Sequence, residues 1–193
     1  MLDPQKQALI LASSSPRRQA LLREAGIAYE SHPPHVPEER ADGEAPVAYA
    51  RRLAEEKAQA VARQFPKRYV LGADTIVLVE HEVLEKPRDA DDAARMLRML
   101  SGCGHSVTTA VSLVNPGGKS DTRCATTQVF FRVVEDGEIA KYIAGGEPMD
   151  KAGAYAIQGG AAQWVQRIEG EYSNVVGLPL ALVREMLRAN GFR

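Results

Sequence analysis

The sequence predicts an α/β protein, because short apolar runs typical of buried strands alternate with amphipathic helical segments. An apolar run at 8–12 leads directly into a predicted helix. A second apolar run, at 69–79, follows a long amphipathic helix predicted over 47–64. Two longer alternating segments, 105–114 and 123–134, are typical of paired strands joined by a turn. Strands and helices are therefore expected along the whole chain.

Length and composition narrow the class of protein. The 193 residues fit one large domain or two intimately packed lobes, with enough chain for a substantial core. A formal net charge of -1 indicates no bulk attraction to nucleic acid or to a membrane, so any anion binding must be local. Two cysteines, Cys103 and Cys124, are too few for a disulfide framework and suit a reducing cytoplasm. The N-terminal residues show the features of neither a signal peptide nor a transmembrane span.

The first predicted strand runs into a serine-rich loop and a helix. Ser15 is a favourable N-cap, Pro16 suits the first helical position and Gly26 ends the helix. Such a unit presents backbone N–H groups and the positive end of the helix dipole to an anion. Arg17 and Arg18 add forked donors suited to phosphate oxygens. An ordinary capped helix with solvated arginines is the alternative; phosphate binding is favoured because positive charges at this helix end need an anion.

A carboxylate lies in the middle of the second apolar run. The run is rich in β-branched residues and predicts a strand buried on both faces, where an unpaired charge is costly. Asp74 follows the small residues Gly72 and Ala73, which let a ligand or metal approach closely. The chain then turns and is expected to return Lys86 towards Asp74. An Asp that caps backbone amides is the alternative; the strand and the lysine favour a functional carboxylate in metal–phosphate chemistry.

Two further polar residues are ambiguous from the pattern alone. Glu38 lies in a proline-rich loop at 32–39, where a glutamate can help to hold a metal, but a solvated acidic loop is the favoured interpretation. Lys57 lies near the apolar stripe of the helix at 47–64, where a lysine usually extends its ammonium group to water.

The C-terminal half contains several further predicted elements. They are a helix capped by Asp89 at 89–100, a helix at 135–144, a strand at 163–168, a loop at 172–179 and a final helix at 180–189. Asp150, Lys151 and Gln158 are polar residues among glycines and apolar neighbours. Either they stabilise loops, or they form a wall that reads a base and phosphates.

Taken together, six motifs resemble the Maf family of nucleoside triphosphate pyrophosphatases, also called septum-formation inhibitors. They stand in the family's order and cover nearly the whole chain. The motifs are LILASSSPRRQALL (9–22), RLAEEKA (52–58), LGADTIV (71–77), LEKPRD (84–89), DKAGAYAIQG (150–159) and RIEGEYSNVVGLPL (167–180).

The resemblance implies a fold, an activity and partners. The implied fold is α/β, with a strongly twisted mixed sheet flanked by helices as in inosine triphosphatases, in a single domain over 1–193 whose two lobes flank a cleft. The implied activity is hydrolysis of a nucleoside triphosphate to the monophosphate and pyrophosphate, with Mg²⁺ or Mn²⁺ as the divalent cofactor. We accordingly expect a cytoplasmic homodimer that binds a nucleoside triphosphate and neither nucleic acid nor a membrane.

The resemblance also assigns residues to the site. Asp74 is similar to the family's catalytic carboxylate, the proton acceptor, and together with Glu38 it is expected at the cation. Ser13, Ser15 and Arg18 match the phosphate-binding loop inferred above from helix capping. The sequence does not separate metal ligation from proton transfer as the role of Asp74.

Three lysines match cleft residues of the family that neutralise triphosphate charge: Lys57, Lys86 and Lys151. For Lys57 and Glu38 the resemblance replaces the interpretation that the pattern alone favours, and nothing else in the sequence does so.

The branch of the family rests on Arg17, Thr75 and Gln158, which match all three positions typical of enzymes acting on dTTP and UTP. The branch acting on 7-methyl-GTP tends to have Trp, Gln and Glu there. A neutral Gln amide both donates to and accepts from a pyrimidine edge, whereas a Glu favours a cationic methylated guanine. Two departures concern the site: Pro37 replaces an acidic residue near the cation position, and the small residues at 160–162 affect the base pocket.

Three alternatives compete with a dTTP/UTP pyrophosphatase. A family member acting on 7-methyl-GTP or modified nucleotides is disfavoured by the same three positions. A cell-division regulator that binds nucleotide without turnover is expected to have lost Asp74 or the lysines, and this sequence keeps them. A nucleic-acid-binding module is disfavoured by the near-neutral charge and the 6% aromatic content.

Overall fold

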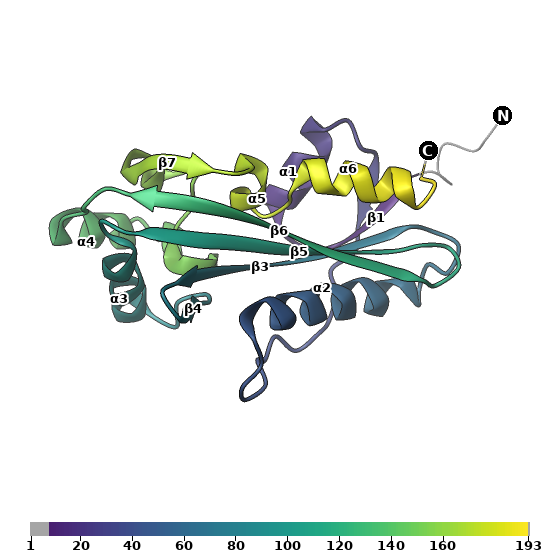
Figure 1. The fold of residues 1–193 in the computed structure, drawn as a ribbon, viewed down its shortest axis with the longest axis horizontal. Helices are drawn as coiled ribbons and strands as arrows, with labels where there is room; N and C mark the ends of the chain where they lie inside the picture. Colours follow the sequence, from purple (N-terminus) through teal and green to yellow (C-terminus); the bar gives the residue numbers. More distant parts are fainter. Residues whose placement is uncertain (1–7, 193) are drawn as a thin grey trace. The chain divides into compact units, whose positions relative to one another are not determined.

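The computed structural model describes residues 8–192 and contains a seven-stranded mixed sheet (Figure 1). The strand order is β2-β1-β3-β5-β6-β7, and β4 pairs with β3 off this path. β1 is parallel to β2 and β3, whereas β4 is antiparallel to β3 and β7 is antiparallel to β6. The prediction of an α/β protein with a mixed sheet is therefore confirmed. The strands are β1 (Leu9–Ala12), β2 (Tyr29–Ser31), β3 (Val70–Val79), β4 (Glu82–Leu84), β5 (Gly104–Val114), β6 (Ser120–Phe131) and β7 (Val165–Glu169).

Helices separate most of the strands. They are α1 (Pro16–Glu24), α2 (Pro46–Ala62), α3 (Ala90–Leu100), α4 (Asp136–Ala144), α5 (Tyr172–Val176) and α6 (Leu180–Ala189), with 3-10 turns η2 (Glu147–Asp150), η3 (Ala152–Ala154) and η4 (Gly160–Trp164). Local signals explain several boundaries: Ser15 caps α1 and accepts from Arg18 N, and Asp89 caps α3 and accepts from Asp92 N. No helix in the described part is long and apolar enough to cross a membrane.

Two expectations for the C-terminal half are wrong. The segment expected to be a loop at 172–179 contains the short helix α5. Its buried Asn174 donates from Nδ2 to Val107 O and to Thr127 Oγ1, both at 3.0 Å, and such long-range partners leave no local sequence signal. The strand expected from Gln163 begins at Val165, because residues up to Trp164 form the 3-10 turn η4.

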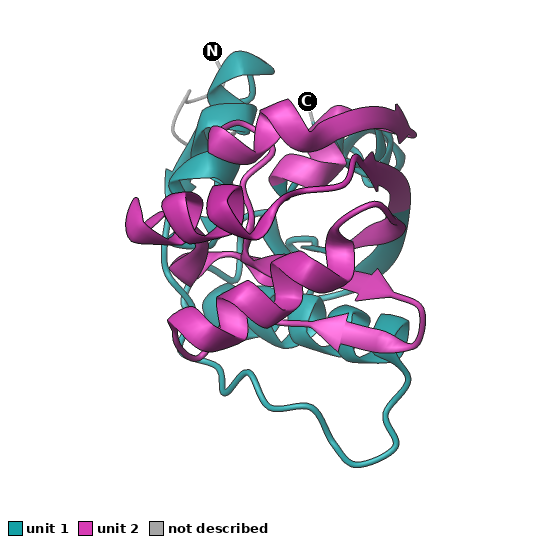
Figure 2. Ribbon diagram, turned by 90° about the vertical axis from the view of Figure 1, so that its left-hand side faces the viewer, with its two compact units in different colours: residues 1–74, 109–125, 177–193 teal, residues 75–108, 126–176 magenta. Residues whose placement is uncertain are grey.

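The chain divides into two compact units (Figure 2). Unit 1 contains the chain up to Asp74, residues 109–125 and the residues from Gly177 onward; unit 2 contains 75–108 and 126–176. The boundary falls within β3, so that Asp74 is the last residue of one segment and Thr75 the first of the next. A cleft between two lobes stays a prediction of the resemblance.

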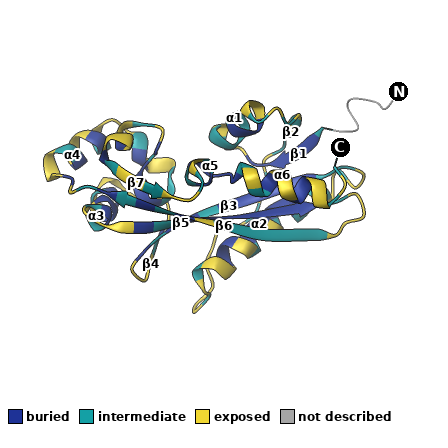
Figure 3. Ribbon diagram, turned by 45° about the horizontal axis from the view of Figure 1, so that its top comes forward, coloured by how far each residue is buried: buried dark blue, intermediate teal, exposed yellow. Residues whose placement is uncertain are grey.

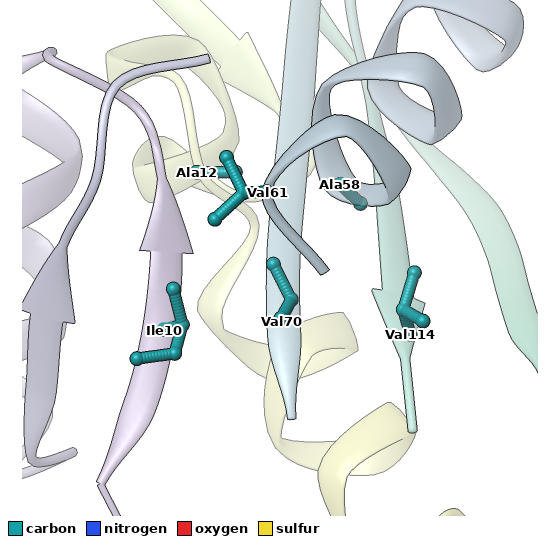
Figure 4. Packing of buried hydrophobic residues seen from close by; sticks show 6 residues of the cluster. All are labelled: Ile10, Ala12, Ala58, Val61, Val70 and Val114. Atoms are coloured by element: carbon teal, nitrogen blue, oxygen red, sulfur yellow. The ribbon is translucent and has the colours of Figure 1, made fainter. Parts of the chain in front are cut away.

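The core of unit 1 is built on the inner strands. β1 is buried over its whole length, and α6 has one buried face, formed by Val183, Met186 and Leu187, and one exposed face (Figure 3). α2 packs on the strands, so that Ala58 and Val61 from the helix meet strand residues (Figure 4). Ile10, Ala12, Val70 and Val114 complete that cluster. The helix that carries Lys57 is therefore fixed against the strand that carries Asp74.

The core of unit 2 contains a group of packed aromatic side chains. Phe131 packs edge-on against Tyr155 and Trp164, with ring centroids 4.9 and 6.1 Å apart, and Tyr142 packs on Trp164 at 4.9 Å. His105 is buried beside this group and its Nε2 lies 2.8 Å from Tyr155 Oη. Burial lowers the pKa of His105 to about 4, so its imidazole is neutral at pH 7.

Candidate active site

Asp74, Lys57 and Glu38 form the centre of the candidate site in unit 1. Asp74 lies within β3, as predicted, and only 8% of its surface is exposed. Lys57 Nζ donates to Asp74 Oδ1 and also lies against Glu38 Oε1, at 2.7 Å from each oxygen. The lysine is itself buried, at 7% exposure, whereas 43% of the Glu38 side chain is exposed. One ammonium group therefore holds two carboxylates together where the pattern alone predicted a solvated lysine.

A glycine in β3 lets the lysine reach this position. Gly72 lies two residues before Asp74, and a Cβ added to it would lie 2.4 Å from Ala54 O and 2.7 Å from Ala58 N. Real Cβ atoms essentially never approach so closely, so the backbone of α2 occupies the space of a side chain at residue 72. Lys57 lies between the two contacting positions on α2. The close approach of α2 to β3 therefore brings the ammonium group of Lys57 to Asp74.

The serine-rich loop between β1 and α1 is ordered by its own hydroxyl groups. Ser13 Oγ accepts from Ser15 N at 3.1 Å, and Ser15 Oγ accepts from Arg18 N at 3.4 Å. Ser31 Oγ donates to Ser13 O at 2.7 Å and ties the loop to β2. The predicted N-cap is confirmed. Ser13 Oγ and Ser15 Oγ act as acceptors in these bonds and keep their own protons, so both hydroxyls can still donate to an anion at this helix end.

Arg18 adds a contact that the sequence did not suggest. Its Nε donates to Gly177 O at 2.8 Å and one terminal nitrogen donates to Ala73 O at 2.9 Å. Burial is the main cause that lowers the pKa of Arg18, and the negative charge of Asp74 acts in the opposite direction. The guanidinium group thus joins α1 to the carbonyl that directly precedes Asp74 and to the chain entering α6. Arg17, in the same turn, is half-buried.

The donor set suits a small divalent cation. Within 8–192 no group of three or more His, Cys, Asp or Glu side chains is placed to hold a metal ion. Asp74 and Glu38 form a two-carboxylate pair that already converges on one cationic group. Mg²⁺ is usually bound through one or two carboxylates together with substrate phosphates rather than by a cage of protein ligands. The two predicted metal ligands therefore fit a cation that is shared with a triphosphate.

The other predicted residues belong to unit 2. Thr75 is half-buried in β3, and Lys86 is an exposed residue after β4. The predicted antiparallel return of the chain is confirmed for β4, where Leu84 pairs with Val77. That Lys86 then reaches Asp74 stays a prediction. Gln158 is exposed before η4. Lys151 donates from Nζ to Glu147 O and to Asp150 Oδ1.

Sequence reasoning missed two residues of this part of the molecule. Tyr142 at the end of α4 and Glu147 in η2 hold the segment around Gln158 through side-chain hydrogen bonds. The only sequence signal is the pair Gly159 and Gly160, which marks a close approach of some group to the backbone. Which group approaches depends on tertiary structure.

The chain matches the model of the Maf-like protein family over residues 8–190. The dTTP/UTP pyrophosphatase of Koribacter versatilis (strain Ellin345) is 55% identical over 183 residues, 95% of this chain and 94% of that protein. Proteins of the same name are 51% identical in Citrifermentans bemidjiense, over 95% of this chain and 96% of the relative, and 50% identical in Geobacillus sp. (strain WCH70), over 93% and 97%.

A more distant likeness exists among solved structures. The nucleoside-triphosphatase / dITP/XTP pyrophosphatase from Mycobacterium abscessus is 18% identical to this chain, with a TM-score of 0.42. The superposed region covers 66% of this chain and 75% of the chain of that protein. A likeness at that TM-score is too low to support an assignment of fold or function. The family match, in contrast, spans nearly the whole described chain, and the curated relatives share about half of its residues. The chain belongs to the Maf-like protein family.

Proposed function

We propose that this protein is a nucleoside triphosphate diphosphatase that hydrolyses dTTP and UTP to the monophosphate and pyrophosphate. The observation that carries the proposal is the buried Asp74 carboxylate, joined with Glu38 by Lys57 beside a hydroxyl-rich helix N-terminus. The relatives named dTTP/UTP pyrophosphatase support the substrate class, since they share 50–55% of their residues over more than nine-tenths of this chain.

The chemistry assigned to the chain is attack of water on the α-phosphorus. The water oxygen forms a bond to phosphorus while the bond from that phosphorus to the oxygen bridging it to the β-phosphorus breaks. Pyrophosphate leaves, and Asp74 accepts the proton lost by the water. A positioned carboxylate acting as a general base contributes about 10²–10⁴-fold to a rate. Lys57 keeps the Asp74 carboxylate in place through its 2.7 Å hydrogen bond to Oδ1.

The divalent cation, Mg²⁺ or Mn²⁺, would be held by Glu38 and Asp74. When bound, it supplies neutralisation of phosphate charge and activation of water. The chain's own contribution is to present the two carboxylates as oxygen ligands on one side of a triphosphate. Lys57 lies at the same point and balances their negative charge.

Phosphate binding is assigned to two sets of groups. Ser13, Ser15 and Arg17 lie at the N-terminus of α1, where the helix dipole and the serine hydroxyls favour an anion. Lys86 and Lys151 add ammonium groups that offset the charge of a triphosphate. For Arg18 the contacts to Ala73 O and Gly177 O assign a positioning role next to Asp74, in addition to its positive charge.

Base selection is assigned to Arg17, Thr75 and Gln158. An amide such as that of Gln158 pairs one donor and one acceptor with the edge of a pyrimidine, and a threonine hydroxyl adapts as donor or acceptor. A site that hydrogen-bonds a base edge rejects a base lacking the matching groups far better than an apolar pocket does. This set therefore favours dTTP and UTP over purine nucleotides.

The test is pyrophosphate release from dTTP, UTP, CTP, dATP, GTP, ITP and 7-methyl-GTP with Mg²⁺ or Mn²⁺. We expect dTTP and UTP to be the best substrates and Asp74→Asn to lower kcat by at least about 10²-fold. The matched control is Asp121→Asn, which changes a half-buried aspartate of unit 1 that pairs with Arg123 and should keep the wild-type kcat.

Preference for 7-methyl-GTP would contradict the assigned substrates. Binding of dTTP without turnover would contradict the assigned activity and favour a nucleotide-binding regulator. The homodimer and the cytoplasmic location implied by the resemblance stay proposals; sedimentation equilibrium of the purified protein tests the first and fractionation of cells tests the second.

A further inference from the structure

We infer that Glu147 and Tyr142 form a positioning pair that sets the place of Gln158 and thereby the base selectivity of the enzyme. The inference rests on the proposed function, because it assigns a role to groups around a residue that the proposed function places at the base. Both residues belong to unit 2, together with Gln158 itself. Neither residue belongs to the centre formed by Asp74, Lys57 and Glu38.

The first observation is the set of contacts made by Glu147. One carboxylate oxygen, Oε1, accepts from Tyr142 Oη at 2.8 Å. The other, Oε2, accepts from Gly160 N at 3.2 Å, two residues after Gln158. The main-chain oxygen of Glu147 accepts from Lys151 Nζ. One residue therefore contacts the segment of Gln158 through its side chain and a predicted phosphate ligand through its backbone.

The second observation concerns the other end of the segment. Tyr142 Oη accepts from Ala156 N at 3.0 Å, two residues before Gln158. The two flanking amides are thus fixed by one connected pair of side chains, while the Gln158 side chain between them is exposed. The backbone that carries Gln158 is held on both sides. Its side-chain amide is exposed and therefore available to a ligand.

The tyrosine is suited to this task by its surroundings. Its ring packs on Trp164 with centroids 4.9 Å apart, and it is 9% exposed. Burial is the main cause that raises the pKa of Tyr142, so its hydroxyl keeps its proton and donates it to the Glu147 carboxylate. The hydroxyl acts as donor to Glu147 and as acceptor for Ala156 N, which are compatible roles of one group.

The third observation is a steric one. A Cβ added to Gly159 would lie 1.9 Å from Glu147 Oε1 and 2.5 Å from Glu147 Cδ. The carboxylate therefore fills the space that a side chain at residue 159 would need. This explains the glycine next to Gln158 without any appeal to backbone strain, because the φ of Gly159 is −113°. The path of the chain beside Gln158 follows the surface of the Glu147 side chain.

A purely structural role predicts a different result from a positioning role. Loss of stability alone lowers the amount of folded enzyme and affects all nucleotides equally. Displacement of Gln158 affects the contacts to the base, so it lowers the ratio of kcat/KM for dTTP to kcat/KM for dATP. Contacts to the phosphates are common to both nucleotides and cancel in that ratio.

The experiment measures this ratio for Glu147→Ala, Glu147→Gln and Tyr142→Phe. We expect Glu147→Ala and Tyr142→Phe to lower it on the order of tenfold, which corresponds to about 1.4 kcal/mol. Glu147→Gln should retain most of the wild-type ratio. The amide oxygen of the new side chain still accepts from Gly160 N, and its NH₂ group can donate to the Tyr142 hydroxyl oxygen. The matched control is Glu138→Gln in α4, whose side chain pairs with Arg132 and should leave the ratio unchanged.

A second pair of variants tests the steric contact. Gly159→Ala should lower the ratio in the wild-type background and do so much less in a Glu147→Ala background, since the clash is then removed. Hydrogen exchange of the amides in 156–160 gives a readout that needs no turnover. Exchange in this segment should be faster in Glu147→Ala and Tyr142→Phe than in the wild type.

The outcomes separate this inference from the proposed function. Wild-type enzyme that does not hydrolyse dTTP contradicts the proposed function, and the ratio of dTTP to dATP binding constants then takes the place of the kinetic ratio. An unchanged ratio in both Glu147→Ala and Tyr142→Phe overturns the positioning pair, whatever happens to their stability. Unchanged hydrogen exchange at 156–160 in these variants overturns it as well.

Discussion

Gly72→Ala tests whether the close contact between α2 and β3 places Lys57 at Asp74. The added methyl group would lie 2.4 Å from Ala54 O, 2.7 Å from Ala58 N and 2.9 Å from Ala58 Cβ. Ordinary contacts begin near 3.4 Å, so the helix and the strand must separate locally by about 1 Å. Two of the three atoms are backbone atoms of a helix and do not move aside as a flexible side chain would.

Two effects of known size follow from this separation. Overpacking of a dense core costs about 1–3 kcal/mol, and the backbone contacts here place Gly72→Ala at the upper end, near 3 kcal/mol. A shift of about 1 Å of Lys57 away from the 2.7 Å hydrogen bond to Asp74 also disturbs the base. Misplacement on that scale in an active site costs on the order of 10²-fold in rate.

Urea denaturation gives the free energy of unfolding, and pyrophosphate release from dTTP gives kcat. The matched control is Gly137→Ala in α4, where an added Cβ meets nothing within 4 Å. This control should be neutral or more stable by up to about 1 kcal/mol, because alanine is the better helix former. The packing explanation is refuted if the free energy of unfolding of Gly72→Ala lies within about 0.5 kcal/mol of the wild-type value and its kcat is unchanged.

Three further changes have expected outcomes. Lys57→Met removes the ammonium group between two carboxylates, so we expect the free energy of unfolding at pH 7 to fall by about 3 kcal/mol, the low end for a buried pair because Glu38 is half-exposed. A urea titration equal to that of the wild type would contradict this. Arg18→Lys loses the fork that reaches Ala73 O and Gly177 O, so kcat should fall about tenfold or more, with unchanged kcat as the contrary result. The pKa of the buried His105 is about 4, against an ordinary value of 6.5. Because the unfolded chain therefore binds this proton more readily, the free energy of unfolding should rise from pH 4 to pH 6.5 by on the order of 3 kcal/mol. His105→Gln should lose that part of the pH dependence; equal slopes for variant and wild type between those pH values would show that His105 does not cause it.

Most of the fold was predictable because its signals are local. The N-caps Ser15 and Asp89, the apolar runs and the long amphipathic helix each depend on residues a few positions apart. The final helix, Leu180–Ala189, has the predicted bounds. Two exceptions are the start of β7, which η4 precedes, and α5. The helix α5 is stabilised by contacts of Asn174 to Val107 and Thr127, far away in the sequence.

The candidate site was predictable from the residues alone only in part. The position of Asp74 in a buried strand is a local anomaly, and this drew attention to it. Lys57 looked like a solvated lysine and Glu38 like a solvated glutamate. Lys57 reaches Asp74 only because α2 packs on β3, and Glu38 pairs with Lys57 across a long stretch of sequence. Family resemblance was needed to assign them to the site. The pair of Tyr142 and Glu147 was missed altogether, since neither the pattern nor the resemblance pointed to it.

The most direct test of the proposed chemistry is hydrolysis of dTTP by the wild-type enzyme in water enriched in ¹⁸O. Attack at the α-phosphorus predicts one labelled oxygen in the nucleoside monophosphate and unlabelled pyrophosphate, and mass spectrometry distinguishes the two products. Label in the pyrophosphate would place the attack at the β-phosphorus. Release of inorganic phosphate with a nucleoside diphosphate would contradict a diphosphatase and, with it, the role assigned to the site of Asp74, Lys57 and Glu38.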